Sequence, residues 1–407
     1  MQNNAIFCLE MSNFAQKEYD TIVCGAGPAG LMAACTLGRL TGTARRILLL
    51  DKKAPWKEPI FCAEAVSADR LAALWPIDPA FVRGRLSGIY FTSPKRYRAE
   101  FYSKNCGLIL NRALFHKSIA DAAQNHGVEC HFDALIHKLE RTESGWNVQV
   151  SQGGESVTLT AKTIIDASGP SCRLTRNIPC LEGIETGDTD LESGIFAVAD
   201  GIEHSPEHIE LFFGSEFQDG YGWIFPRDGK EVNIGFVLGK SVKNGEPLRQ
   251  KLMNFIAKNY PKATVKAVYG GMIACGQSNK PLAKCGLFKA GDAASCVNPI
   301  SRSGIVESLL SGKIAAEAVD QWLKDSGENR GAIEEATLAR WMKALGKNHL
   351  QIANAKAGFN SITDEQFDKA AKRLSRLPRE KQTLIRIFWN VLWSCPSVIW
   401  KMRSFLR

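Results

Sequence analysis

Two glycine-rich turns, far apart in the chain, hold the residues best suited to chemistry. The first, Gly25-Ala-Gly-Pro-Ala-Gly30, follows an apolar run typical of a strand and precedes an apolar helix pattern. Gly25 permits a tight turn, Gly27 lets a pyrophosphate approach the backbone, and Gly30 lets the helix pack on the sheet. The free N–H groups of the helix start, next to Ala29, can bind the phosphates. The pattern predicts a dinucleotide site.

An acidic residue follows the second strand pattern. That pattern, residues 46–50, ends at Asp51, which stands 21 residues after Gly30. An acid at this distance accepts hydrogen bonds from an adenosine ribose. NAD and FAD share this arrangement, so it does not decide between them.

The second turn, far downstream, favours FAD. Gly291-Asp292 lies between an apolar run and a helix pattern, and an acid in such a turn suits the ribityl and pyrophosphate end of a flavin. A third turn, Asp166-Ala-Ser-Gly169, follows another apolar run and is expected to contact the dinucleotide. Together the three turns predict an FAD-dependent oxidoreductase.

The composition is that of a globular enzyme from a reducing compartment, which we take to be the cytoplasm. The chain has 407 residues, 45% hydrophobic and 23% charged, enough for two domains and a large core. Its twelve cysteines form no CxxC pair and no ligand-like cluster with histidine, so no metal site is expected. Many unpaired cysteines suit reducing conditions. Residues 1–18 are polar, lack the apolar core of a secretory signal, and are expected to be a disordered leader.

Positive charge is concentrated in the C-terminal tail, residues 372–407. The tail holds nine Lys or Arg and one acid, a net +8 of the chain's +9. Its residues 384–400 are apolar, include three tryptophans, and are marginally short for a transmembrane helix. This pattern favours a helix in the headgroup region of an anionic membrane. A helix packed on the protein's own core is the alternative. Nucleic acid is a poorer partner, because the basic residues surround an apolar segment rather than a stacking platform.

The order of the elements predicts an α/β fold with a discontinuous nucleotide domain. Residues 19–180 and 271–325 carry the three turns and are expected to form an FAD-binding Rossmann-like domain. Residues 181–270 are mostly strand-like and predict an inserted, β-sheet-rich substrate domain. Strands within 84–110 are expected to contribute to the substrate side. Residues 326–407 predict C-terminal helices that lie at a membrane interface.

Several motifs resemble those of the geranylgeranyl reductases, FAD enzymes with the glutathione reductase and para-hydroxybenzoate hydroxylase type of fold. The resemblance covers residues 19–375. Its general flavoprotein part comprises the first turn, Asp51, the helix start at Asn111-Arg112, the Asp166 turn and Gly291-Asp292. The resemblance implies that Arg112 also contacts the cofactor.

Two motifs are specific to that family. Phe61-Cys62-Ala-Glu64-Ala-Val-Ser67 is similar to its cysteine-bearing loop, and Tyr221-Gly-Trp223-Ile-Phe225-Pro226 is similar to its YxWxFP motif. The resemblance implies saturation of isoprenoid double bonds and a Cys62 near the flavin ring.

The loop before the last dinucleotide helix departs from the family pattern. Family members carry small residues after an Asn-Pro pair, whereas here Arg302 and Ser303 precede Gly304 and Ile305. The resemblance implies that this loop lies beside the pyrimidine edge of the flavin, with Gly304 and Ile305 at the cofactor. Arg302 is expected either to alter the flavin's potential or to point into solvent.

Alkene reduction needs a hydride from reduced flavin, a proton donor and an apolar tunnel that excludes water. Tyr221, Trp223 and Phe225 alternate along one strand and share a face, so with Pro226 they are candidates for the substrate-binding wall. An ordinary aromatic core would give the same pattern.

The catalytic candidates are Cys62, Glu64, Tyr221 and Trp223. We expect Cys62 to orient the substrate or to tune the flavin. Glu64, two residues later, is a candidate proton relay. An inert buried thiol and a surface or capping glutamate are the alternatives.

These features predict a peripheral enzyme on the cytoplasmic face of the membrane that saturates geranylgeranyl or polyprenyl chains on a lipid or prenyl diphosphate. A monooxygenase or halogenase of the same fold is the alternative, although Tyr221 replaces the first Trp of the halogenase W-x-W-x-I-P motif. No second GxGxxG marks a nicotinamide domain. Electrons are therefore expected from transiently bound NAD(P)H or from an external ferredoxin-like carrier.

Overall fold

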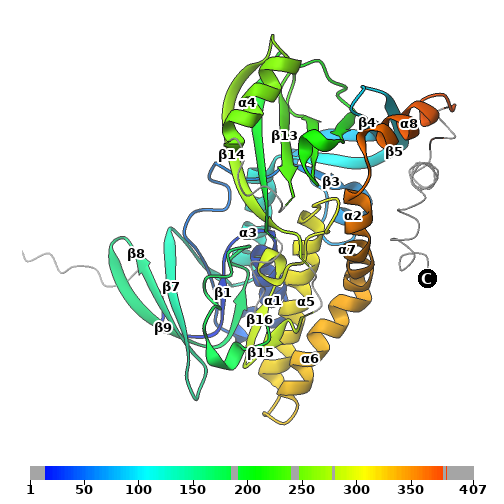
Figure 1. Cartoon of the computed structure of the whole chain (residues 1–407). Coiled ribbons are helices and arrows are strands. Elements are labelled where there is room, and N and C mark those ends of the chain that lie inside the picture. Colours follow the sequence, from blue (N-terminus) through cyan, green and yellow to red (C-terminus); the bar gives the residue numbers. More distant parts are fainter. Residues whose placement is uncertain (1–13, 185–190, 240–246, 277–279, 379–381, 383–407) are drawn as a thin grey trace, which may run out of the picture.

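Two eight-stranded sheets, linked along one side by helices, make up the protein (Figure 1). The computed structural model describes residues 14–184, 191–239, 247–276, 280–378 and 382. The apolar segment 384–400 of the tail lies outside the described residues.

The first sheet, here called the nucleotide sheet, brings the predicted turns to one edge. Its strand order is β15-β16-β9-β1-β2-β6, and β16, β9, β1, β2 and β6 pair in parallel. Parallel strands end at the same edge of a sheet, so the turns after β1, β2, β9 and β16 lie together there. The members are β1 (Glu18–Cys24), β2 (Ile47–Asp51), β6 (Glu129–Phe132), β9 (Glu155–Asp166), β15 (Ala283–Lys284) and β16 (Leu287–Lys289), extended by the antiparallel pair β7 (Ala134–Arg141) and β8 (Trp146–Gln152).

Three helices pack with the nucleotide sheet: α1 (Pro28–Thr41), α3 (Arg112–Asn125) and α5 (Ile305–Lys324). Pro28 begins α1, where its missing N–H has no cost and its fixed φ suits a helix. Asn111 caps α3 by accepting a hydrogen bond from the Leu114 N–H at 3.2 Å. Residues 29–38 of α1 are all buried, so this helix lies in the core between its neighbours.

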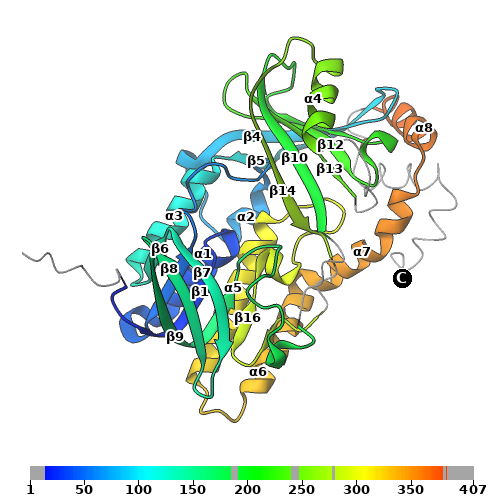
Figure 2. The same cartoon turned by 60° about the vertical axis from the view of Figure 1, so that its left-hand side comes forward.

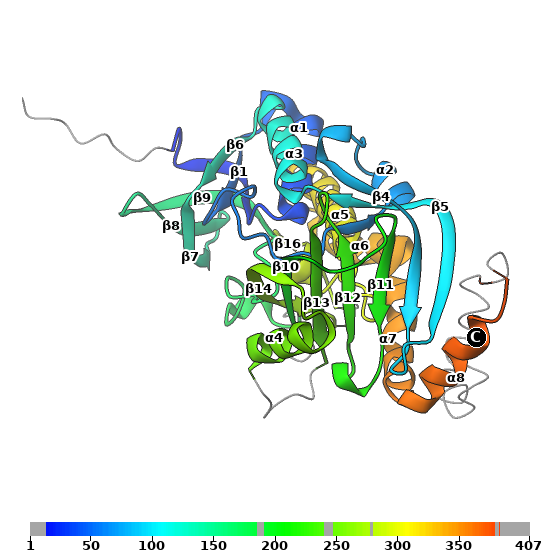
Figure 3. The same ribbon diagram turned by 90° about the horizontal axis from the view of Figure 1, so that it is seen from above.

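The second sheet, here called the substrate sheet, combines distant parts of the chain. Its strand order is β14-β10-β13-β12-β11-β4-β5-β3. Figure 3 shows the strands from β14 to β5 side by side. Helix α4 (Leu248–Asn259) covers one face, and its buried residues Leu252 and Phe255 pack with Ile224 and Phe236. The members are β3 (Ala65–Ser67), β4 (Val82–Thr92), β5 (Arg98–Leu110), β10 (Leu191–Asp200), β11 (His208–Phe212), β12 (Tyr221–Pro226), β13 (Val232–Leu238) and β14 (Thr264–Ala274).

The C-terminal helices run from the nucleotide sheet to the substrate sheet (Figure 2). They are α6 (Arg330–Trp341), a π-helical turn over 342–346, α7 (Lys347–Asn360) and α8 (Asp364–Leu374), whereas the short α2 (Ala68–Ala72) follows β3. Helix α8 is tied to the turn after β4, because Asp368 accepts hydrogen bonds from the Ser93 hydroxyl at 2.7 Å and the Lys95 N–H at 2.8 Å.

Strand β14 runs across the domain boundary that was expected after residue 270. This strand continues to Ala274 and pairs with β10 along its length. The substrate sheet also takes β3 at residues 65–67, in addition to the strands expected within 84–110. The chain therefore passes between the two sheets more often than a single inserted domain would require.

Candidate active site

A largely apolar cavity of about 580 Å³ lies where the two sheets meet. Its wall combines the start of α1, the start of α5 and the inward faces of β5, β10 and β12. Pro28 and Asp292 mark the end at the nucleotide sheet, and Trp223 and Phe225 mark the end at the substrate sheet. A volume of this size suits a flavin ring together with part of a ligand.

The turn between β1 and α1 has the geometry of a pyrophosphate cradle. Gly25 has a φ of 106°, and a Cβ there would lie 2.4 Å from the Ala167 carbonyl oxygen. A Cβ on Gly30 would lie 1.8 Å from the Gly25 oxygen, so both positions require glycine. At Gly27, by contrast, nothing lies within 4 Å of the Cβ position. No side chain of the described residues caps α1, which leaves its first N–H groups available to an anion.

Ala29 has a packing role at this turn. A Cβ on Gly291 would lie 2.8 Å from the Ala29 Cβ, and one on Gly312 would lie 2.1 Å from the Ala29 oxygen. The two glycines thus allow α1, α5 and the Gly291 turn to approach one another closely. Ala29 shapes the cradle without lining the cavity.

Asp51 and Asp166 stand at the ends of their strands, as predicted. The Asp51 carboxylate accepts hydrogen bonds from the Ala26 N–H at 2.6 Å and the Lys53 N–H at 3.2 Å, which fixes it beside the cradle. Asp166 is fully buried, and one of its oxygens accepts from the Ser168 N–H and hydroxyl. Its other oxygen has no hydrogen-bond partner among the described residues.

The Gly291 turn brings Asp292 to the cavity wall. Gly291 has a φ of 62° and donates its N–H to the Ser311 hydroxyl at 2.9 Å. Burial raises the pKa of Asp292 to about 6, and the Arg112 guanidinium acts against this rise. Gly304 and Ile305, at the start of α5, line the same cavity. The open cradle, the N-termini of α1 and α5 without side-chain caps, and the carboxylates of Asp51, Asp166 and Asp292 fit FAD.

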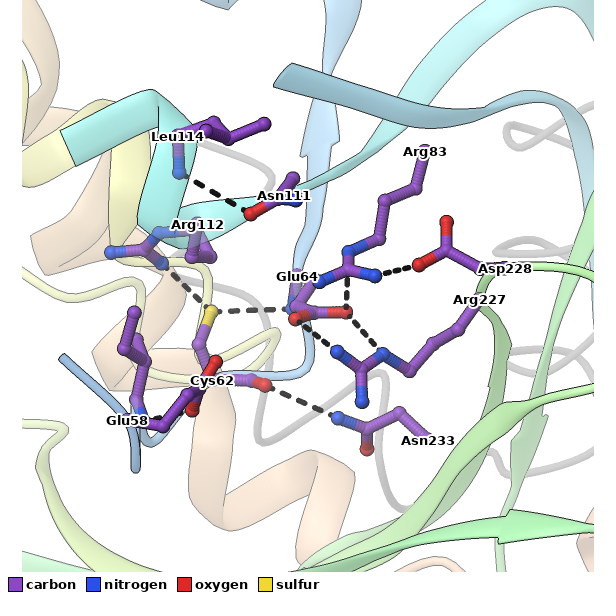
Figure 4. A network of polar contacts seen from close by, with 11 residues as sticks. Glu58, Cys62, Glu64, Arg83, Asn111, Arg112, Leu114, Arg227, Asp228 and Asn233 are labelled. Atoms are coloured by element: carbon purple, nitrogen blue, oxygen red, sulfur yellow. Dashed lines mark hydrogen bonds and ion pairs between the residues drawn. The ribbon is translucent and has the colours of Figure 1, made fainter. Parts of the chain in front are cut away.

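Cys62 lies in the cavity wall, and Figure 4 shows its sulfur beside Arg112 and Glu64. Its sulfur accepts hydrogen bonds from the Arg112 guanidinium at 2.8 Å and the Glu64 N–H at 3.2 Å. Arg112 is itself held by His116, whose Nε2 lies 2.7 Å from the guanidinium. His116 Nδ1 lies 2.7 Å from the Pro55 carbonyl oxygen, which can only accept, so Nδ1 carries the proton and Nε2 accepts from Arg112.

Glu64 belongs to a buried charged network shown in Figure 4. Its carboxylate pairs with Arg227 at 2.9 Å and with Arg83 at 3.9 Å, and Arg83 also pairs with Asp228. Glu64 has a φ of 73°, which orients its N–H toward Cys62 in a backbone conformation that is unusual for glutamate. Burial raises the pKa of the Glu64 carboxyl, and the two guanidinium groups act against that rise.

The aromatic residues of β12 share one face, as their spacing predicted. Tyr221, Trp223 and Phe225 all line the cavity, whereas Ile224 packs on the opposite side under α4. Pro226 is buried at the end of β12 and is not part of the cavity wall. Of the four residues expected to form the substrate wall, the three aromatic ones therefore line the cavity and Pro226 does not.

Hydrogen bonds fix two of these aromatic side chains. The Tyr221 hydroxyl donates to the Ser301 carbonyl oxygen at 2.5 Å, and burial raises the pKa of this hydroxyl to about 12. The Trp223 indole donates to Asn233 at 2.8 Å, and Asn233 donates in turn to the Cys62 carbonyl oxygen at 3.2 Å. Hydrogen bonds thus tie Tyr221 to the loop that contains Ser301 and tie Trp223, through Asn233, to the loop that contains Cys62.

The site residues predicted from the sequence did not include four members of these hydrogen-bond networks: Arg83, Arg227, His116 and Asn233. Asn233 stands next to the β12 motif in a strand pattern, and a polar residue in such a strand is a usable signal of a buried partner. Arg83 and Arg227 reach Glu64 only because β4 and β12 belong to one sheet, a fact that no local pattern contains.

The described residues offer neither a metal site nor a membrane-spanning helix. Among the described residues, no three His, Cys, Asp or Glu side chains are grouped as metal ligands. No helix in the described part of the chain is both long and apolar enough to span a bilayer.

The fold, the cradle and the family comparison agree on the class of protein. The sequence model of the family "FAD dependent oxidoreductase" matches residues 53–318, more than half of the chain. The chain belongs to this family, which confirms the predicted cofactor and the predicted FAD-binding α/β fold.

Full-length relatives give the narrower group. The chain is 30% identical to a digeranylgeranylglycerophospholipid reductase of Methanosphaera stadtmanae, over 92% of this chain and 96% of the relative. It is 28% identical to a protein of the same name from Methanosarcina acetivorans, over 96% of each. A geranylgeranyl bacteriochlorophyll reductase-like protein from Thermoplasma acidophilum shares the fold, with a TM-score of 0.83, 21% identity, and coverage of 96% and 99%. The chain is thus a member of the geranylgeranyl reductase family.

Proposed function

We propose that this enzyme saturates the carbon–carbon double bonds of geranylgeranyl chains carried on a membrane lipid. The observation that carries the proposal is the single cavity that joins the FAD cradle to an apolar aromatic chamber, with Cys62 between them. The similarity to digeranylgeranylglycerophospholipid reductases supports a lipid as the carrier of the chain.

Each part of the cavity has a task in this reaction. Bound FAD, when reduced, supplies a hydride to one carbon of the double bond. The walls formed by Trp223 and Phe225 hold the chain and exclude water. Cys62 donates a proton to the second carbon, and the Arg112 guanidinium and the Glu64 N–H stabilise the sulfur that has lost it. Arg112 thereby serves both the cofactor and the proton donor.

Glu64 is the proposed route by which the proton on Cys62 is restored. Its carboxylate lies in the Arg83 and Arg227 network and lines a second, smaller cavity of about 270 Å³ that also reaches Cys62. We propose that electrons come from NAD(P)H or a ferredoxin-like carrier, and that the enzyme works at the cytoplasmic surface of an anionic membrane.

An anaerobic assay tests the function. The purified protein, reduced with dithionite and given a geranylgeranyl lipid, should add one H2 per double bond, as measured by mass spectrometry. A monooxygenase or halogenase would instead leave the chain unsaturated and consume oxygen in the presence of its own substrate. Unchanged lipid, together with substrate-dependent oxygen uptake, would overturn the proposal.

The substitution Cys62→Ser tests the assigned proton donor. Serine keeps the size of the side chain but is a much weaker acid, so alkene reduction should fall about 10²-fold while FAD stays bound. The matched control is Cys106→Ser, since Cys106 lines the same cavity but its thiol donates a hydrogen bond to the Leu86 carbonyl oxygen at 3.6 Å and is not bonded to a guanidinium group. Equal rates for the two variants would show that Cys62 is not the donor.

A further inference from the structure

The departure from the family pattern at Arg302 creates a buried group of charges. Arg302 has a φ of 55° and lines the cavity beside Gly304 and Ile305. Its side chain is 3% exposed, so it points into the protein and not into solvent. Hydrogen bonds from its guanidinium reach the carbonyl oxygens of Ile300 at 2.5 Å and Asp219 at 3.0 Å.

Arg302 forms a triad with two residues from other parts of the fold. Its Nε lies 2.8 Å from one oxygen of Glu192 on β10, and the other oxygen of Glu192 lies 2.6 Å from Lys356 on α7. The Glu192 side chain is 2% exposed. The guanidinium also lies over the Tyr221 ring, 5.3 Å from its centre. Two positive groups share one carboxylate, so the triad carries one net positive charge.

A surplus charge in a buried position favours an anion close by, because water screens it poorly. The triad lies next to the start of α5, a helix of 20 residues. The acid in its first turn, Glu307, pairs with Arg70 at 3.0 Å, so the helix N-terminus still adds positive potential. Hydride can reach a chain at the aromatic wall only from a flavin ring between the cradle and that wall, and residues 301–305 line this stretch of the cavity.

We propose that the Arg302–Glu192–Lys356 triad raises the reduction potential of the bound flavin through its net positive charge. FAD takes up two electrons from the external donor and one proton, and the product FADH⁻ carries a negative charge on its pyrimidine part. A positive charge beside it stabilises the reduced form over the oxidised one. The inference rests on FAD binding, which is a property of the family, and on the ring position given above, but not on the identity of the lipid.

The test is the midpoint potential of the bound FAD, measured by spectroelectrochemistry with reference dyes. Lys356→Met makes the triad neutral and should lower the potential. Glu192→Gln leaves two positive charges and should raise it. Each change should shift the ratio of reduced to oxidised flavin at a fixed solution potential about tenfold, which is about 30 mV for a two-electron couple. The control Lys324→Met removes a charge at the far end of α5 and should leave the potential unchanged.

The signs of the two shifts in midpoint potential distinguish an effect of charge from an effect of altered loop structure. If the triad only holds the loop in place, both variants should shift the potential in the same direction or lose FAD, and either outcome overturns the proposal. Lys356→Met is the safer variant, since its side chain is 20% exposed. The absorbance of bound FAD reports cofactor loss separately, and the lipid assay reports failure of the proposed function separately.

Discussion

Cys62 depends on a chain of hydrogen bonds that begins outside the cavity. The Pro55 carbonyl fixes the tautomer of His116, His116 orients Arg112, and Arg112 contacts the sulfur. Each bond leaves the next group in a defined orientation, so in the proposed mechanism His116 acts on the reaction through Arg112 and Cys62. His116 is therefore a positioning residue in that mechanism. The apolar pattern of α3 indicates only that this position packs in the core.

The His116 ring makes stability depend on pH. Burial, and next the Arg112 charge, lower the pKa of His116 from 6.5 to about 3 in the folded protein. As pH falls below 6.5, the unfolded chain binds a proton that the folded chain does not, so stability is present above this range and is lost between pH 6.5 and about 3. Between pH 7 and pH 5 the loss due to this group should be about 2 kcal/mol.

Urea unfolding of the wild type and of His116→Gln at pH 7 and pH 5 measures this effect. Glutamine can both donate to Pro55 and accept from Arg112, so the variant should fold but lack that part of the pH dependence. His349, whose pKa burial lowers to about 4, remains in both proteins and cancels in the difference. The same pH dependence in both proteins would refute the neutral, buried state of His116.

At the scale of elements, the turn between β1 and α1 contains glycines needed for two different reasons, one for close packing and one for cofactor binding. The Cβ position of Gly30 overlaps the Gly25 oxygen, whereas that of Gly27 is open. Gly30→Ala should therefore destabilise the fold. Gly27→Val should fold normally and lose FAD, since the new side chain would occupy the space of the pyrophosphate. Thermal unfolding and FAD titration distinguish these outcomes, and a Gly27→Val protein that binds FAD as the wild type does would contradict the assigned cradle.

Elements with local signals could be predicted from the sequence. The common face of Tyr221, Trp223 and Phe225 was predictable because side chains alternate along a strand. The cofactor was predictable because the strand-to-helix turns require glycine at fixed positions. The extent of β14 was not predictable, since it is set by pairing with β10, whose residues lie about 70 positions earlier. The Arg302–Glu192 pair is likewise a product of tertiary contact, and the sequence left open whether Arg302 faces solvent.

At the scale of the whole molecule, the C-terminal helices bind the two sheets together. Lys356 on α7 pairs with Glu192 in the substrate sheet, and Asp364 at the start of α8 accepts from Ser215 at 2.7 Å. Buried Leu374 and Gln382 continue this packing, and Gln382 accepts a hydrogen bond from the Glu100 N–H at 2.7 Å. The first part of the basic tail is therefore integral to the fold. Its exposed Lys372, Arg373 and Arg376, together with the residues beyond Gln382, remain as candidates for a membrane contact.

A stop codon directly after Gln382 tests the proposed membrane contact. A stop after Ala371 would also remove the last turn of α8, which ends at Leu374. The later cut removes residues 383–407, which contain four Lys or Arg, no acid and three tryptophans. At about 1 kcal/mol per basic residue near an anionic surface, binding to such vesicles should fall at least 100-fold.

Sedimentation with phosphatidylglycerol vesicles measures this loss, and phosphatidylcholine vesicles provide the comparison without surface charge. The truncated enzyme should keep its FAD and its activity on a short, soluble prenyl analogue, because the described fold is intact. Activity on the long-chain lipid should fall, since such a substrate reaches the cavity only from a bilayer. A second variant with alanine in place of Trp389, Trp393 and Trp400 separates apolar burial from charge. Unchanged vesicle binding after truncation would show that the segment packs on the protein and that another surface meets the membrane.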